Sequence, residues 1–555
     1  MSKLRFGIMV DGDSLKQWQV NAIQQLLDAY VAEPILVIKN GSPTGNPPIG
    51  ELLGNGLFYV YKKFFANATS LESRPFPEQL NTAETINCTV SRKGKFSEYF
   101  SSEDLDTIKS HNLDFILRFG FGIIRGEIHN ATKYGIWSFH HGDEQKYRGG
   151  PYCFWEVFYQ DRLTGSILQR LTDKLDGGIV LKKGQFGTVR HSYAANIEQA
   201  LSASSDWPKQ VCIDINNGKT DHLNSDPSPT DAPIYKLPGN LRMIQFFFIQ
   251  AFAFGKHWYE KISGWDHWGV GFVNASVGQI IENKGIKAEW MDWVHPEKGS
   301  FIADPSLYSN GETSYLLCEK LDYSNPLGFL TFQTIENGKV GQESILLKEP
   351  HHLSYPRLIL ENGETFMIPE TSDAGCVQAY RMIGELGKWD APTTLIPNLK
   401  GIDPTVFKHD GKWWMFVSTL GDGHAYKLLL YYSEELLGTW KAHSNNPVKF
   451  DVRTGRGGGG VFNYENQLYR PGQDYSEKHE GALNLFKIKK LTTTEYEEDF
   501  ICHLGPIKHS PFPDKIHTID VVGDRIVIDA CKEMSVLFRP NLFALKWKLL
   551  RHKSK

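Results

Sequence analysis

The chain begins with an alternation of apolar runs and helical patterns. Buried strands are predicted for residues 6–10, 34–38, 113–119 and 135–139. Helices are predicted for residues 15–30, 105–112 and 127–134. This alternation predicts an α/β domain with a mostly parallel sheet. Because ligands of such sheets lie beyond the carboxyl ends of the strands, the segments just after Phe119 and Phe139 are candidate site positions.

The pattern changes in the second half of the chain. Residues 215–235 are rich in turn formers and predict a loop, and residues 235–262 predict a connecting helix. From Trp265 onward, a turn followed by an apolar strand recurs about every 50 residues. The five copies begin at Asn310, Asn362, Asp410, Tyr464 and Gly523. This spacing predicts a five-bladed β-propeller, with a β-sandwich of coincidental hairpins as the alternative.

The predicted fold class is therefore α/β plus all-β. An α/β domain is expected over residues 1–190, a loop and helical connector over 191–264, and the propeller over 265–550. A length of 555 residues agrees with this division, because it exceeds what a single hydrophobic core supports.

Composition narrows the function classes. With 41% hydrophobic residues, 22% charged residues and a net charge of −4, the chain is globular and shows no sign of a nucleic-acid or anionic-membrane partner. The longest apolar run, residues 243–255, is too short to span a bilayer, so no membrane insertion is expected. Seven scattered cysteines without a CxxC motif indicate a reducing compartment and no zinc site. No signal-peptide pattern precedes the first strand, and we predict a cytoplasmic location.

Residues 135–150 (Gly-Ile-Trp-Ser-Phe-His-His-Gly-Asp-Glu-Gln-Lys-Tyr-Arg-Gly-Gly) carry the first candidate chemistry. His140 ends a predicted strand, and Asp176 follows in a later loop. A histidine with a carboxylate is an ordinary general-base arrangement, in which the carboxylate fixes the tautomer. The alternative is a structural histidine that is hydrogen-bonded in a turn.

These residues resemble the folate-dependent formyltransferase family, which includes methionyl-tRNA and sugar-nucleotide N-formyltransferases. His140 and Asp176 match the catalytic pair of that family, Tyr147-Arg148-Gly149 matches its Tyr-Arg-Gly, and Ser138 replaces its oxyanion-binding asparagine. The resemblance implies a Rossmann-like domain that uses 10-formyltetrahydrofolate as co-substrate and needs no metal. It also implies a folate pocket formed by Phe119, Gly120, Phe121, Gly122, Ile123 and Asp173.

The expected acceptor is an amino sugar. A tRNA acceptor would require a basic surface, and the sequence offers no large block of lysine or arginine. The resemblance therefore implies formyl transfer to a small-molecule amino sugar, nucleotide- or glycan-linked, in surface-polysaccharide biosynthesis. An oligomer is compatible with the sequence, which does not determine the oligomeric state.

The second part resembles the propellers of glycoside hydrolase family 43 and a propeller module found beside glycosyltransferase-type domains. The resemblance rests on Asp-Pro and Tyr-Pro pairs at residues 304–305, 355–356 and 403–404, on residues 469–474 and on His517. It implies inward-pointing carboxylates, for which Asp304, Glu370 and Asp403 are the candidates.

Two alternatives to simple formyl transfer remain open. The propeller would make the protein bifunctional if it were itself a glycoside hydrolase or a glycosyl-transfer module. If Ser138 marks a degenerate transferase domain, and the aspartates only cap backbone N–H groups, the chain is instead a non-catalytic glycan-binding protein.

Overall fold

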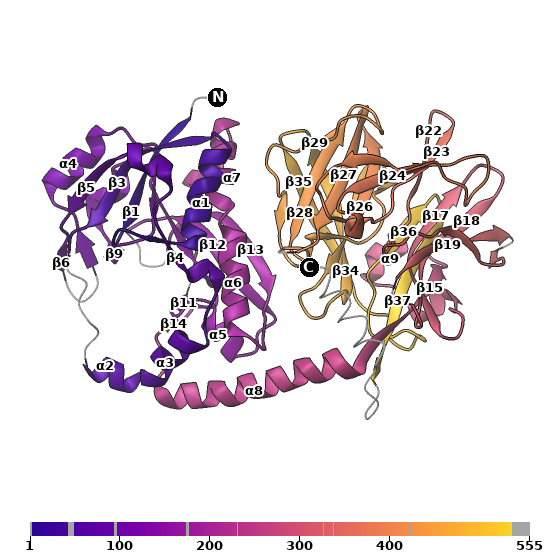
Figure 1. Cartoon of the computed structure of the whole chain (residues 1–555), viewed down its shortest axis with the longest axis horizontal. Coiled ribbons are helices and arrows are strands. Elements are labelled where there is room, and N and C mark those ends of the chain that lie inside the picture. Colours follow the sequence, from indigo (N-terminus) through magenta and orange to yellow (C-terminus); the bar gives the residue numbers. More distant parts are fainter. Residues whose placement is uncertain are drawn as a thin grey trace. The chain divides into compact units, whose positions relative to one another are not determined.

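The computed structural model describes residues 3–42, 49–93, 97–173, 177–229, 231–325, 327–336, 338–421 and 423–535. The chain divides into two compact units, Met1–Gly255 and Lys256–Lys555, each described below by itself (Figure 1). Among the described helices, none is long and apolar enough to cross a bilayer.

The first unit is built on a seven-stranded sheet with the order β13-β12-β10-β8-β1-β3-β5. The five strands from β10 to β5 are parallel, and β12 and β13 join them as antiparallel strands. Taken in chain order, the parallel strands follow the 3-2-1-4-5 sequence of a doubly wound sheet, which confirms the predicted α/β class. The strands are β1 (Leu4–Val10), β3 (Ala32–Asn40), β5 (Glu84–Cys88), β8 (Phe115–Arg118), β10 (Ile136–His140), β12 (Leu163–Arg170) and β13 (Ile179–Gly187).

Helices cover this sheet and extend the first unit beyond residue 190. α6 and α7 pack against β12 and β13, with Ile197, Leu201 and Val211 buried. The predicted helix at 127–134 is a short 3-10 helix, Gly126–Asn130. The helices of this unit are α1 (Gln17–Asp28), α2 (Ile49–Gly54), α3 (Gly56–Phe64), α4 (Ser102–Ser110), α5 (Phe154–Phe158), α6 (Tyr193–Ser204) and α7 (Trp207–Asn216), and α8 (Asn240–Ser263) leads from this unit into the second.

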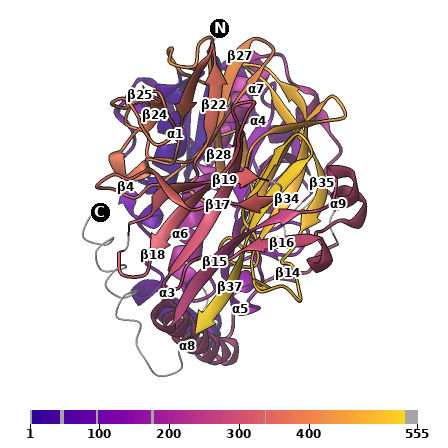
Figure 2. The ribbon, with the colours of Figure 1, turned by 90° about the vertical axis from the view of Figure 1, so that its right-hand side faces the viewer.

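The second unit consists of five consecutive antiparallel sheets, which confirms the predicted propeller. The first blade joins strands from both ends of this unit: β15 pairs with β37 from Gly264↔Ser535 to Phe272↔Val527, and the two strands run side by side in Figure 2. This pairing closes the ring. The blades are β15 (Gly264–Val273), β16 (Met291–Val294), β36 (Ile519–Val522) and β37 (Arg525–Ser535); β17 (Ser300–Ser309), β18 (Ser314–Asp322), β19 (Phe329–Glu336), β20 (Lys339–Val340) and β21 (Ser344–Leu347); β22 (Leu358–Glu361), β23 (Glu364–Met367), β24 (Val377–Arg381) and β25 (Thr393–Ile396); β26 (Gly401–His409), β27 (Lys412–Thr419), β28 (Lys427–Ser433), β29 (Lys441–Ala442) and β30 (Lys449–Phe450); and β31 (Arg456–Gly457), β32 (Phe462–Tyr464), β33 (Gln467–Asp474), β34 (Ala482–Leu491) and β35 (Tyr496–Leu504).

Three consecutive blades share an unusual backbone feature before a proline. Asp304, Tyr355 and Asp403 have φ values of 49°, 51° and 51°, in the left-handed region that non-glycine residues avoid. The pairing register shifts at Asp304 in β17 and at Asp403 in β26, as in a β-bulge. Bulges redirect side chains and occur next to functional sites, so these three positions direct attention to the centre of the propeller.

Candidate functional site

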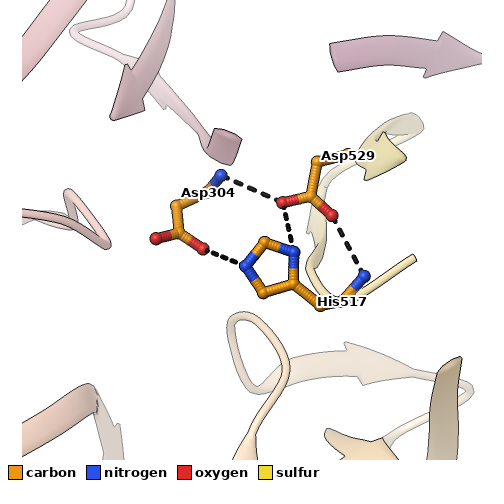
Figure 3. A group of neighbouring side chains, drawn as sticks. All are labelled: Asp304, His517 and Asp529. Atoms are coloured by element: carbon orange, nitrogen blue, oxygen red, sulfur yellow. Dashed lines mark hydrogen bonds and ion pairs between the residues drawn. The ribbon is translucent and has the colours of Figure 1, made fainter. Parts of the chain in front are cut away.

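The centre of the propeller contains a histidine between two aspartates (Figure 3). His517 Nε2 lies 3.1 Å from Asp304 Oδ1, and His517 Nδ1 lies 2.9 Å from Asp529 Oδ2. The backbone N–H of Asp304 donates to Asp529 Oδ2 at 3.0 Å. All three side chains are buried. We call this group the Asp-His-Asp triad.

Charge explains the protonation of the triad. Burial alone would lower the pKa of His517, but Asp529 and Asp304 together raise it well above its usual value. For Asp304 the directions are reversed: burial alone would raise its pKa, but the hydrogen bonds and the charge of His517 lower it. The triad is therefore an imidazolium held between two carboxylates, and Asp304 is ionised.

The donor set of the triad fits an imidazolium better than a metal. The ligand atoms lie within 4.8 Å of one another, a spacing that a metal ion also accepts. However, both ring nitrogens face carboxylate oxygens, and the backbone N–H groups of His517 and Thr518 donate to Asp529 Oδ1. Asp304 also accepts bonds from Thr518 Oγ1 at 2.9 Å and the Tyr355 N–H at 3.2 Å. These contacts hold Asp304 in a fixed orientation.

Asp403 lies in a second charged group. Arg456 Nε donates to Asp403 Oδ2 at 2.5 Å, and Gln473 Nε2 donates to the same oxygen at 3.0 Å. Arg456 Nη1 also donates to the Tyr475 hydroxyl at 2.7 Å. Burial raises the pKa of Asp403 to about 7 against the attraction of Arg456, and nearby Glu370 adds to the rise.

Glu370 completes the set of predicted carboxyls. Its Oε1 accepts a bond from Ser372 Oγ at 2.8 Å, and its Oε2 accepts a longer one from the Asp403 N–H at 3.4 Å. Burial raises the pKa of Glu370, although Arg456 opposes the rise. Because Asp304 influences the pKa of both Glu370 and Asp403, the structure brings the three predicted residues into one electrostatic cluster.

Several residues of this cluster were absent from the predicted site. Asp529 is a member of the triad, and Arg456 forms an ion pair with Asp403. The third residue, buried Glu319, has a pKa that burial and the charge of Asp304 raise well above its usual value. Glu319 pairs in register with Ala303, the neighbour of Asp304. The glycine run 457–460 directly after Arg456 was the one local signal, since such runs mark close backbone approaches. Asp529 lies in an ordinary apolar strand pattern, which gives no such signal.

The residues predicted in the first unit occupy the carboxyl end of the sheet. His140 Nε2 lies 2.9 Å from the Tyr147 carbonyl oxygen, and Ser138 Oγ accepts a bond from Arg118 Nη1 at 3.0 Å. Asp176 lies outside the described residues. A small recess lies beside His140, lined by His140, His141, Gly142, Tyr147, Arg148, Gly149, Gly150, Pro151, Tyr152, Cys153, Trp155 and Glu156.

The predicted folate loop is held by the chain itself. The Phe121 N–H donates to Asp11 Oδ1 at 2.6 Å, and the Gly122 N–H donates to Glu98 Oε2 at 2.5 Å. Asp173 Oδ1 accepts a bond from the Gly126 N–H at 2.8 Å. Of the remaining predicted pocket residues, Phe119 and Gly120 lie between β8 and β9 (Ile123–Ile124), and Ile123 is the first residue of β9.

The fold and the cluster define the second unit as a five-bladed propeller with buried acidic groups at its centre. Residues 289–505 match the family described as "Glucosamine inositolphosphorylceramide transferase 1, N-terminal". A protein of that name from Oryza sativa subsp. japonica is 35% identical over 206 residues, which are 36% of this chain and 28% of the relative. The Arabidopsis thaliana protein of the same name is 33% identical over 206 residues, 36% of this chain and 27% of the relative.

The chain therefore matches less than a third of the length of these relatives. Among solved structures, a family 43 β-1,3-galactosidase with galactodeoxynojirimycin is similar with a TM-score of 0.28 and 10% identity, covering 39% of this chain and 78% of that chain. An exo-β-1,3-galactanase from Clostridium thermocellum is similar with a TM-score of 0.30 and 9% identity, covering 38% and 52%.

These similarities correct the predicted activity. The prediction of a folate-dependent N-formyltransferase that modifies an amino sugar is wrong, because the matching family and relatives are transferases named for glucosamine and inositolphosphorylceramide. The motif around His140 misled the prediction for a physical reason. A doubly wound sheet places polar residues at the carboxyl ends of its strands for many unrelated chemistries, so His140 and Tyr-Arg-Gly together do not specify formyl transfer.

Proposed function

We propose that the protein binds a sugar at the centre of the propeller and transfers it by exchange of its glycosidic bond. One observation carries this proposal: an ionised Asp304 shares a buried cluster with Glu370, whose pKa is raised, inside the segment that matches the transferase family. Two carboxyl groups whose environments drive their pKa values in opposite directions provide a base and an acid in one site.

The roles follow from the protonation states. In the proposed reaction, protonated Glu370 donates its proton to the leaving oxygen as the bond from that oxygen to the anomeric carbon breaks. The acceptor hydroxyl forms the new bond to the anomeric carbon and gives its proton to Asp304. The Asp-His-Asp triad orients Asp304 for this step, and water in place of the acceptor would give hydrolysis.

The names of the relatives support a substrate class. They are named for glucosamine and for an inositol phosphate lipid, so we propose a hexosamine as the transferred sugar and an inositol phosphate group as the acceptor. Because the match spans less than a third of those relatives, this substrate class is part of the proposal.

Sugar binding without bond exchange is the second candidate function. It is favoured by the hydrogen bonds of Asp304, whose two carboxylate oxygens both accept bonds from the chain itself, from Thr518 and Tyr355. A carboxylate held in this way is a weaker base for an incoming hydroxyl.

Glu370→Gln is expected to lower turnover about 10²-fold or more, because glutamine cannot protonate the leaving oxygen. Purified protein would be incubated with aryl hexosaminides and aryl hexosides, with and without inositol phosphate, and release of the aryl alcohol followed. Glu364→Gln, an exposed glutamate in β23 of the same blade, is the matched control and should keep full turnover. Sugar binding by calorimetry without turnover would favour the second candidate, and absence of both would contradict the proposal.

A further inference from the structure

Helix α8 has an apolar face that its own unit leaves uncovered. Met243, Phe246 and Ala253 are buried. At 100° per residue these positions share one side of the helix, while Phe248 and Phe252 point to the opposite side. Phe248 is 74% exposed and Phe252 is 76% exposed. We call this opposite side, formed by Leu241, Ile244, Phe248 and Phe252, the outer face of α8.

Neighbouring helices add exposed apolar side chains beside the start of α8. Asn240 joins α8 to α3, since its Oδ1 accepts a bond from the Leu57 N–H at 3.0 Å and its Nδ2 donates to the Leu53 carbonyl at 2.7 Å. The Tyr61 ring of α3 packs on the Phe246 ring of α8, with ring centroids 5.3 Å apart, and α3 lies beside the start of α8 in Figure 1. The exposed apolar residues of this neighbourhood are Ile49, Leu53, Val60, Phe64 and Phe65. Exposed apolar side chains gathered on neighbouring helices in this way mark an interaction site.

The charges next to this surface are predominantly positive. α3 carries Lys62 and Lys63, and α8 carries two lysines and an arginine, whereas the acidic residues of α2, α3 and α8 are Glu51 and Glu260. The net charge of −4 for the whole chain conceals this basic concentration.

We propose that the outer face of α8 adsorbs to an anionic membrane surface, with the helix lying parallel to the bilayer. Exposed phenylalanines on one side of a helix, with lysines and arginines flanking them, are the features of helices that lie in the membrane interface. Anionic lipids attract basic side chains that lie near the membrane surface. A second copy on this face would carry the same predominantly basic surroundings, so charge favours an anionic membrane over a symmetric contact. The proposal rests on this surface and is independent of the proposed reaction.

The test is co-sedimentation of the full chain with vesicles of phosphatidylcholine alone and with added phosphatidylserine. The wild-type protein should pellet with the phosphatidylserine vesicles and be released by high salt. Phe248→Ser combined with Phe252→Ser should weaken binding about tenfold or more, because two exposed rings leave the interface. Lys62→Glu combined with Lys63→Glu should weaken it at low salt.

Phe500→Ser is the matched control, because Phe500 is 59% exposed on β35 of the propeller. It should leave vesicle binding unchanged, and unchanged thermal unfolding of each variant would show that the fold is intact. Failure of the wild-type protein to bind phosphatidylserine vesicles would overturn the proposal. So would a dimer, measured by light scattering, that the double phenylalanine variant dissociates, since the face would then belong to a second copy.

Discussion

His517→Leu is expected to lower the free energy of unfolding of the propeller by about 3–5 kcal/mol near neutral pH. The imidazolium is the cation between Asp304 and Asp529, and its removal leaves two buried carboxylates without a charge partner. Breaking a buried ion pair from one side is costly because the remaining charge stays desolvated. Urea unfolding of the wild-type and variant proteins measures the difference.

The pH dependence of this loss has a definite sign. The pKa of His517 in the folded state is raised above its usual value of 6.5, so its stabilisation is complete below that pH and is lost as the pH rises through the folded-state pKa. In His517→Leu, burial without the neighbouring cation raises the pKa of Asp304. The deficit of the variant should therefore shrink as the pH falls toward about 4, where carboxyl groups are protonated in the unfolded chain as well.

His409→Leu is the control for this experiment. His409 also lies near an aspartate, with Nε2 3.3 Å from Asp410 Oδ2, but the Asp410 side chain is 85% exposed. Exposed pairs contribute little, so this variant should unfold like the wild-type protein. Equal losses for His409→Leu and His517→Leu would show that the triad has no special energetic role.

Local signals in the sequence predicted the second unit well. Asn362-Gly363 and Asp410-Gly411 adopt the left-handed backbone that tight hairpins require, with φ values of 53°, 83°, 49° and 75°. Asp304 and Asp403 were found because an Asp-Pro pair at a blade start is a local feature. Repetition made each signal stronger, since five weak copies at one spacing specify a ring.

The partners of these aspartates could not be found in the same way. Asp529 contacts Asp304 across 225 positions, and Arg456 contacts Asp403 across 53. Ring closure creates these contacts, and no periodicity in the sequence records which distant side chains it brings together. The prediction of the activity failed for the opposite reason. His140 lies in a strong local motif, but a short motif on a common type of sheet does not specify a reaction.

Glu498→Gln is expected to be as destabilising as loss of His517, about 3–5 kcal/mol, because it breaks a second buried pair inside the fifth blade. Arg470 Nε lies 2.9 Å from Glu498 Oε2, and the two side chains are 1% and 0% exposed. Lys449 Nζ lies 3.2 Å from Glu498 Oε1, so the variant leaves two cations facing a neutral amide. Urea unfolding at neutral pH measures the loss.

Acid titration separates this pair from a packing defect. Burial would raise the pKa of Glu498, but Arg470 and Lys449 lower it from 4.5 to about 2. The pair therefore stabilises the fold above pH 4.5, and its contribution is lost as the pH falls from 4.5 to about 2. Wild-type stability should fall through this window by the amount that Glu498→Gln has already lost, so the two unfolding curves should converge in acid.

A double variant tests whether the cost comes from the uncompensated charge. Arg470→Met combined with Glu498→Leu replaces the buried pair by apolar side chains, and such replacements are often neutral or stabilising. It should regain part of the stability that Glu498→Gln alone loses, while Lys449 keeps some solvent contact. If the double variant is less stable than Glu498→Gln, the hydrogen bonds of Arg470 to Thr454 and Tyr496 matter more to the blade than the balance of charge.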